Sequence, residues 1–158
     1  MKKILIVLIA LIAIGVSIGA VSAEGFDFSF GSESNTDGGD FSLENNKLSL
    51  QGIDLKIPEG FKENESARTL AEDTDAFGEG CKVSYTEFYN NDTNIIVKVF
   101  FGNDGKIENV TGENPIKIGN QDGFLDEKDG RAIFDYSIDG KVVEINAPNQ
   151  DTIKTLLG

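Results

Sequence analysis

Two pairs of alternating apolar segments constrain the fold of this chain more strongly than any other feature of its sequence. In CKVSYTEFY (81–89) and NIIVKVFFG (94–102) apolar residues recur at alternate positions, and a polar run at 90–93 separates the two segments. RAIFDYSI (131–138) and KVVEINA (141–147) repeat the pattern around an Asp-Gly pair, which favours a two-residue turn. Because alternation with a period of two is typical of half-buried strands, the sequence predicts two β-hairpins.

Weaker patterns extend the predicted α+β domain over residues 48–158. Alternation across 48–57 predicts two short strands joined by a turn. Residues 66–76 (SARTLAEDTDA) contain helix-forming Ala, Leu and Glu behind a serine that can cap them, which predicts a short helix. Asn149 can cap a second short helix, which carries apolar residues at helical spacing and ends at Gly158.

The expected fold class is therefore α+β. We expect an antiparallel β-meander of roughly six to eight strands with one or two short helices packed on one face, preceded by an N-terminal hydrophobic leader. A span of 111 residues can form one core without disulfides, and Cys81, the only cysteine, is interpreted as a small buried apolar residue. The predicted core consists of Ile53, Leu55, Ile57, Val83, Tyr85, Val97, Val99, Phe101, Phe134, Tyr136, Val143, Ile145, Ile153 and Leu156.

The N-terminus has the features of an export signal. Lys2 and Lys3 precede residues 4–23, which contain no charged residue and end in small side chains. This order matches a secretory signal peptide at 1–23 that is cleaved after Ala23. A run of this length also spans a bilayer core of about 30 Å, so residues 1–23 alternatively form an N-terminal membrane anchor. In both cases we expect an extracytoplasmic location for the rest of the chain, either secreted or anchored to the cell membrane.

Residues 24–47 (EGFDFSFGSESNTDGGDFSLENNK) are rich in Gly, Ser, Asn and acidic residues. Such a composition buries too little apolar surface to order itself, so we interpret the segment as a flexible acidic tether. The alternation of Phe26, Phe28 and Phe30 leaves two other interpretations open, in which this stretch is an edge strand that docks on the domain or lies in the interfacial zone of a retained membrane anchor.

The charge of the exported part limits its partners. Residues 1–23 contain two lysines and no acid, so the remainder has 27 acidic and 12 basic residues and a net charge of −15. Nucleic acids and anionic lipids repel such a surface, and no cluster of Lys and Arg offsets it. We expect no nucleic-acid partner, membrane contact only through residues 4–23, and a protein or envelope component as the partner.

The residue inventory argues against the commonest catalytic routes. The chain has no histidine, which removes Ser-His-Asp and Cys-His catalysis and the usual zinc ligands. Acidic turns at 73–75, 90–92 and 126–129 offer oxygen ligands of the kind that Ca²⁺ prefers, but none completes an EF-hand. We predict no catalytic, cofactor-binding or metal-binding residues and no cofactor. A pair of carboxylates remains the one catalytic alternative.

Three N-glycosylation sequons occur in predicted loops. Their acceptors are Asn64, Asn91 and Asn109, and none has Pro at the middle position. Export would expose these residues to the glycosylation machinery, so we regard all three as candidate modification sites.

Three segments behind the leader carry a resemblance to known sequences: IDLKIPEGFKE (53–63), DGFLDE (122–127) and FDYSIDGKVVEINAPNQDTIKTLLG (134–158). With the leader, they resemble small uncharacterised exported proteins of methanogenic archaea. The resemblance covers most of residues 48–158 and implies an exported α+β module, but it supplies no catalytic residue. The function we expect is that of a non-enzymatic surface or envelope module that binds a partner. The alternatives are an accessory or sensor domain of a membrane complex and a carboxylate-dependent hydrolase.

Overall fold

The computed structural model describes residues 40–102 and 107–158. These residues form mostly antiparallel β-structure with one C-terminal α-helix, as the predicted fold class requires. The elements are β1 (Phe41–Glu44), β2 (Lys47–Leu50), β3 (Ile53–Lys56), β4 (Lys62–Glu63), the 3₁₀ turn η1 (Glu65–Ala67), β5 (Thr69–Thr74), β6 (Cys81–Asn90), β7 (Thr93–Gly102), β8 (Pro115–Ile118), β9 (Gln121–Lys128), β10 (Arg131–Ile138), β11 (Lys141–Ala147) and α1 (Gln150–Leu157).

The larger of two sheets contains eight strands. Its order is β4-β6-β7-β11-β10-β9-β8, and β5 pairs with β6 beside β4. Both predicted hairpins are confirmed as β6–β7 and β10–β11. They lie next to each other because β11 pairs with β10 along one side and with β7, which is distant in the sequence, along the other. The larger sheet is therefore two hairpins joined side by side, extended by β9 and β8 beyond β10 and by β4 and β5 beyond β6.

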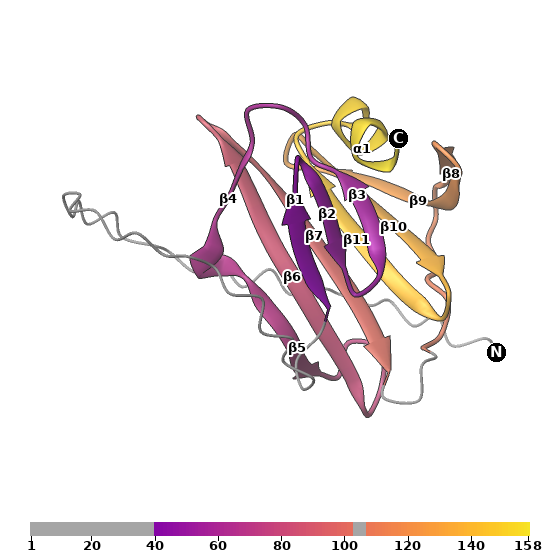
Figure 1. The fold of residues 1–158 in the computed structure, drawn as a ribbon. Coiled ribbons are helices and arrows are strands. Elements are labelled where there is room, and N and C mark those ends of the chain that lie inside the picture. Colours follow the sequence, from indigo (N-terminus) through magenta and orange to yellow (C-terminus); the bar gives the residue numbers. More distant parts are fainter. Residues whose placement is uncertain (1–39, 103–106) are drawn as a thin grey trace. The chain divides into compact units, whose positions relative to one another are not determined.

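The smaller sheet consists of β1, β2 and β3, and together with α1 it covers one face of the larger sheet (Figure 1). The turn between β2 and β3 contains Gln51 and Gly52, both at positive φ. As predicted, Asn149 caps α1, since its side chain accepts a hydrogen bond from the Thr152 backbone, and Gly158 ends the helix. Eleven predicted core residues are buried between these layers: Ile53, Leu55, Ile57, Val97, Val99, Phe134, Tyr136, Val143, Ile145, Ile153 and Leu156.

The other three predicted core residues are not buried there. Val83 and Tyr85 are half-buried on the opposite face of the sheet, because Ser84 and Thr86 are the β6 residues that pair with Val99 and Val97 and point into the core. The face of β6 was therefore predicted wrongly. Phe101 is half-buried near the end of β7. The more apolar face of β6 packs on a separate small cluster through Cys81 and Val83, so its apolar alternation does not mark the face that points into the main core.

The predicted helix at 66–76 is also wrong. The segment begins within the 3₁₀ turn η1 and continues as β5, which pairs with β6 through a register shift between Thr69 and Glu72. At this irregularity Ala71 has a φ of 55°, and its N–H donates to the Ser84 hydroxyl. A position at the edge of the sheet thus outweighs the weak helix propensity of the segment.

The domain starts before residue 48. β1 lies within the segment predicted to be a tether and pairs with β2 from Phe41 to Glu44, so residues 41–47 belong to the sheet. Phe41 and Leu43 pack against the main core. The leader at 1–23, the rest of the tether and the alternating Phe26, Phe28 and Phe30 lie outside the described residues.

Candidate functional site

The face of the larger sheet opposite β1–β3 and α1 carries the chemically richest surface among the described residues. Strand register places five of its side chains in one row across β6, β7, β11, β10 and β9. We call this set the charged row; its members are Tyr85, Lys98, Glu144, Asp135 and Phe124. Neighbouring strands are spaced by about 4.8 Å, so its two terminal aromatic residues lie about 19 Å apart.

An ion pair and an opposing carboxylate form the centre of the charged row. Lys98 Nζ donates to Glu144 Oε1 at 2.8 Å, and the Glu144 side chain is only 6% exposed. Asp135 stands directly opposite Glu144 on the neighbouring strand. Burial, reinforced by the charge of Glu144, raises the pKa of Asp135 from 3.8 to about 7, although Lys98 opposes the shift. Lys98 is hydrogen-bonded to Glu144 and acts on Asp135 only through its charge. Asp135 is therefore the carboxylate that an additional cation would stabilise.

The two flanks of the charged row differ in character. On one side, Phe100 and Val142 form a small apolar cluster that is covered by Phe77, Ile107 and Val110. On the other side, Arg131 donates to the side chain and the backbone of Asn146 and to the carbonyl of Asn94. Burial lowers the pKa of Arg131, whereas the charge of Glu87 opposes this shift. The charged row therefore lies between this apolar cluster and the hydrogen-bond network of Arg131. The paired strands fix the distances between its side chains.

The sequence already contains part of this site. A two-residue turn at Asp139-Gly140 places Asp135 opposite Glu144, so their adjacency follows from the predicted hairpin. The approach of Lys98 does not follow, because it depends on the pairing of β7 with β11, which no local pattern specifies.

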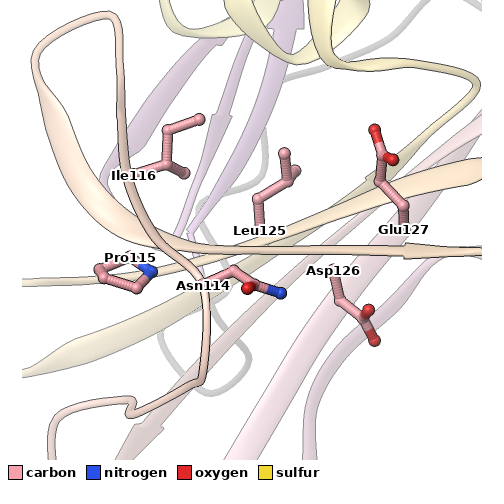
Figure 2. Close-up of a pocket in the computed structure, with 6 residues that line it drawn as sticks. All are labelled: Asn114, Pro115, Ile116, Leu125, Asp126 and Glu127. Carbon is pink, nitrogen blue, oxygen red and sulfur yellow. The ribbon is translucent and has the colours of Figure 1, made fainter.

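Two open hollows in the described surface lie along β8 and β9, and one of them reaches Phe124 at the end of the charged row. One, of about 420 Å³, is lined by Asn114, Pro115, Ile116, Leu125, Asp126 and Glu127 (Figure 2). Its two acids are successive residues of β9 and point to opposite sides of the strand. They are therefore not a convergent catalytic pair.

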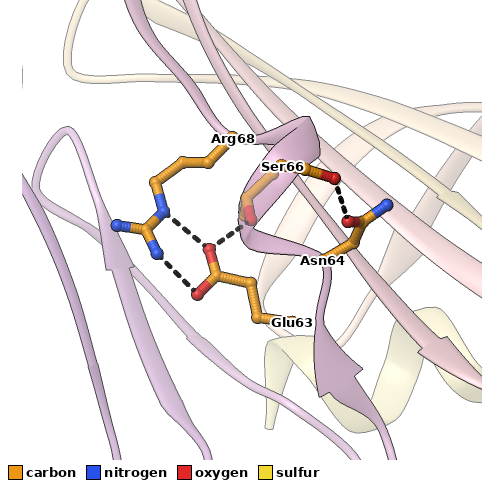
Figure 3. Close-up of polar contacts among 5 residues, drawn as sticks. Glu63, Asn64, Ser66 and Arg68 are labelled. Carbon is orange, nitrogen blue, oxygen red and sulfur yellow. Dashed lines mark hydrogen bonds and ion pairs between the residues drawn. The ribbon is translucent and has the colours of Figure 1, made fainter. Parts of the chain in front are cut away.

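A second polar cluster fastens the edge of the sheet. Arg68 donates from Nε and Nη2 to the two carboxylate oxygens of Glu63, at 2.8 and 3.0 Å (Figure 3). Thr86 donates to the same carboxylate, and the Arg68 guanidinium lies 4.1 Å from the centre of the Phe41 ring. Because the carboxylate is satisfied and 7% exposed, we assign this cluster a structural role.

The three candidate glycosylation sites have different surroundings. Asn64 is half-buried at the start of η1, and its side chain contacts Glu87 and Ser66 (Figure 3 shows the contact with Ser66). Asn91 is exposed in the turn between β6 and β7, and Asn109 is exposed in the segment before β8. The structure brings none of the three together.

Other chemistry is sparse in the parts of the chain that the structure describes. No group of three or more Cys, Asp or Glu side chains within them is arranged to hold a metal ion. Cys81 is 2% exposed, and burial raises the pKa of its thiol. Across 40–102 and 107–158, no helix has both the length and the apolar character needed to cross a bilayer.

Comparisons with known proteins give no family to which the chain can be assigned. No protein-family model, no curated protein and no solved structure matches it.

Proposed function

We propose that this protein is an exported, non-enzymatic module of the cell surface or envelope that binds a basic partner through the charged row. The observation that carries the proposal is that Asp135 and Glu144 stand directly opposite each other on neighbouring strands, while Lys98 of β7 is hydrogen-bonded to Glu144 alone of the two. The leader supports an extracytoplasmic location, in which residues 1–23 either direct secretion or hold the protein at the membrane, free or as an accessory domain of a membrane complex.

The charged row has features of a recognition surface rather than of a stabilising one. Like charges directly opposite each other on neighbouring strands destabilise a sheet. Burial is the main cause of the raised pKa of Asp135, and the charge of Glu144 adds to it. A lysine or arginine of a partner would offset the repulsion and restore a charged Asp135. Tyr85 and Phe124, half-buried at the two ends of the row, add aromatic surface of the kind that is enriched at interfaces.

A carboxylate-dependent hydrolase is the second candidate, and one observation favours it. Asp135 with a pKa of about 7 beside Glu144 is reminiscent of the acid pair of glycoside hydrolases, in which one carboxyl group holds its proton near neutral pH. The proposal of a binding module is better supported, because Glu144 is held in an ion pair with Lys98 and neither described hollow includes the two carboxylates, so no cleft for a sugar chain adjoins them in the described part of the chain.

Capture of partners from the native envelope, after crosslinking to the full-length protein, tests the proposal. Asp135→Asn should abolish recovery of a basic partner, whereas Asp129→Asn makes the same substitution in an exposed turn and should leave recovery unchanged. Equal recovery with both variants would refute a role for the charged row. Hydrolysis of oligosaccharides by the wild type, lost in Asp135→Asn, would instead favour the enzyme.

A further inference from the structure

The three sequons differ in whether the folded chain presents their acceptor nitrogen. We infer that the folded protein accepts N-linked glycans at Asn109 and Asn91 but not at Asn64. The inference rests on the proposed export, because the transfer takes place outside the cytoplasm.

Both ends of the Asn64 amide are engaged. Nδ2 donates to Glu87 Oε2 at 3.0 Å, and Oδ1 accepts from the Ser66 hydroxyl at 2.7 Å. The Asn64 backbone N–H also donates to the Glu87 carbonyl at 2.8 Å, which fixes the residue against β6. Glu87 is itself held by Asn94. A sugar on Nδ2 would have to occupy this half-buried junction, so the fold protects Asn64.

Asn109 has the opposite arrangement. Ile107 and Val110 fasten its segment to the β10–β11 hairpin, through hydrogen bonds to the Gly140 carbonyl at 3.1 Å and the Ser137 hydroxyl at 2.9 Å. The Val110 side chain packs on the apolar cluster of Phe100 and Val142. Asn109 and Thr111, on either side of it, are both exposed. The acceptor amide and the sequon hydroxyl thus face solvent from a fixed backbone.

Asn91 is presented by the turn of the longest hairpin. It follows β6, has a φ of 49° and is exposed, as is Asp92. Thr93 begins β7 and is half-buried, whereas Thr111 is exposed, so the sequon of Asn91 is presented less fully than that of Asn109. We therefore expect both sites to be used, with higher occupancy at Asn109.

The chemistry requires a glycosyl donor activated as a lipid-linked phosphate or diphosphate ester. A bond forms between Nδ2 and the anomeric carbon of the sugar while the bond from that carbon to the phosphate oxygen breaks. The phosphate leaves with the bonding electron pair, and Nδ2 loses one proton to a base of the transferase. Because Nδ2 is the atom that reacts, its accessibility decides which sequon is used.

The test is intact-mass and glycopeptide mass spectrometry on the full-length protein purified from its native cells after fractionation. Thr111→Ala and Thr93→Ala should each remove one glycan, Ser66→Ala should leave the mass of the glycans unchanged, and the control Thr111→Ser should retain modification at Asn109. A glycan on Asn64, or unmodified Asn91 and Asn109 in protein recovered outside the cytoplasm, would overturn this inference alone. Recovery of unmodified protein in the cytoplasm would overturn the proposed export and this inference together.

Discussion

At the scale of single residues, the core of this protein tolerates polar side chains because each has a partner. Ser84 is fully buried on β6, where it accepts hydrogen bonds from the Gln51 side chain at 3.0 Å and from the Ala71 N–H at 2.9 Å. These two bonds connect β6 to the smaller sheet and to the irregular edge strand β5. The serine is therefore a junction among three elements, which explains why the core face of β6 is not the more apolar one.

Replacing Ser84 with Ala should lower the free energy of unfolding by about 1–3 kcal/mol, because the substitution leaves the buried Gln51 amide and the half-buried Ala71 N–H without an acceptor. Urea denaturation measures the effect. Ser42→Ala on the exposed side of β1 is the matched control and should have little influence. Equal unfolding midpoints for the two variants would contradict the role of Ser84.

The pKa of Asp135 predicts a pH dependence of stability. Folding raises this pKa from 3.8 to about 7, so the folded state binds the proton more tightly than the unfolded state. Asp135 therefore lowers stability progressively as the pH rises from about 4 to about 7, with no further change above that range.

Asp135→Asn should remove this dependence and raise stability at pH 8 by about 1–3 kcal/mol, a value discounted for partial exposure. Thermal or urea unfolding at pH 5 and pH 8 measures the difference, with Asp129→Asn as the control. If the wild type were more stable at pH 8 than at pH 5, and Asp135→Asn abolished that difference, the predicted direction of the pH dependence would be wrong.

At the scale of elements, the smaller sheet is a structural part of the domain. β1 contributes the half-buried Phe41 and Leu43, and the carbonyl of Asp40 accepts a hydrogen bond from the Gln51 N–H at 2.7 Å. A chain that begins at residue 48 should still fold, but it should be less stable than residues 40–158 by about 2 kcal/mol, since partial burial of two large apolar side chains is lost. Urea unfolding of both fragments tests this, and equal midpoints would show that β1 is dispensable.

The close pairing of β9 with β10 depends on a glycine. A Cβ atom at Gly123 would collide with the Asp135 carbonyl oxygen and lie 2.7 Å from the Phe134 ring. Gly123→Ala should therefore destabilise the fold by about 1–3 kcal/mol through overpacking, with Asp122→Ala at the exposed neighbour as the control. Thermal unfolding measures the effect. If Gly123→Ala were as stable as the wild type and the control, β9 and β10 would have to move apart at little cost, and the requirement for glycine would be refuted.

The elements also show where sequence reasoning succeeds. Both hairpins and α1 were predictable, because a turn or a cap and a nearby apolar pattern specify them together. β5 was not, because its conformation depends on hydrogen bonds to β6 and to Ser84, which a helix-like composition does not reveal. The junction of β7 with β11 joins residues distant in the sequence, and the position of Lys98 in the charged row depends on it.

At the scale of the whole molecule, charge governs the proposed behaviour outside the cell. Residues 24–158 carry a net charge of −15, so they should not co-float with vesicles of anionic lipid at either low or high salt. The full-length protein with an uncleaved leader should float with them through residues 4–23. Flotation of the leaderless protein would show that the domain itself has membrane affinity.

The edge strands of the larger sheet affect how copies of the protein behave at high local concentration. On one margin β6 is shared between the two-residue β4 and the kinked β5, and on the other the four-residue β8 begins with Pro115 and carries Lys117. Short, bent, proline-containing or lysine-bearing border strands offer few consecutive free backbone groups to a neighbouring chain. Many copies crowded on one surface can therefore remain separate, without continuing one another's hydrogen-bond ladders into a fibril.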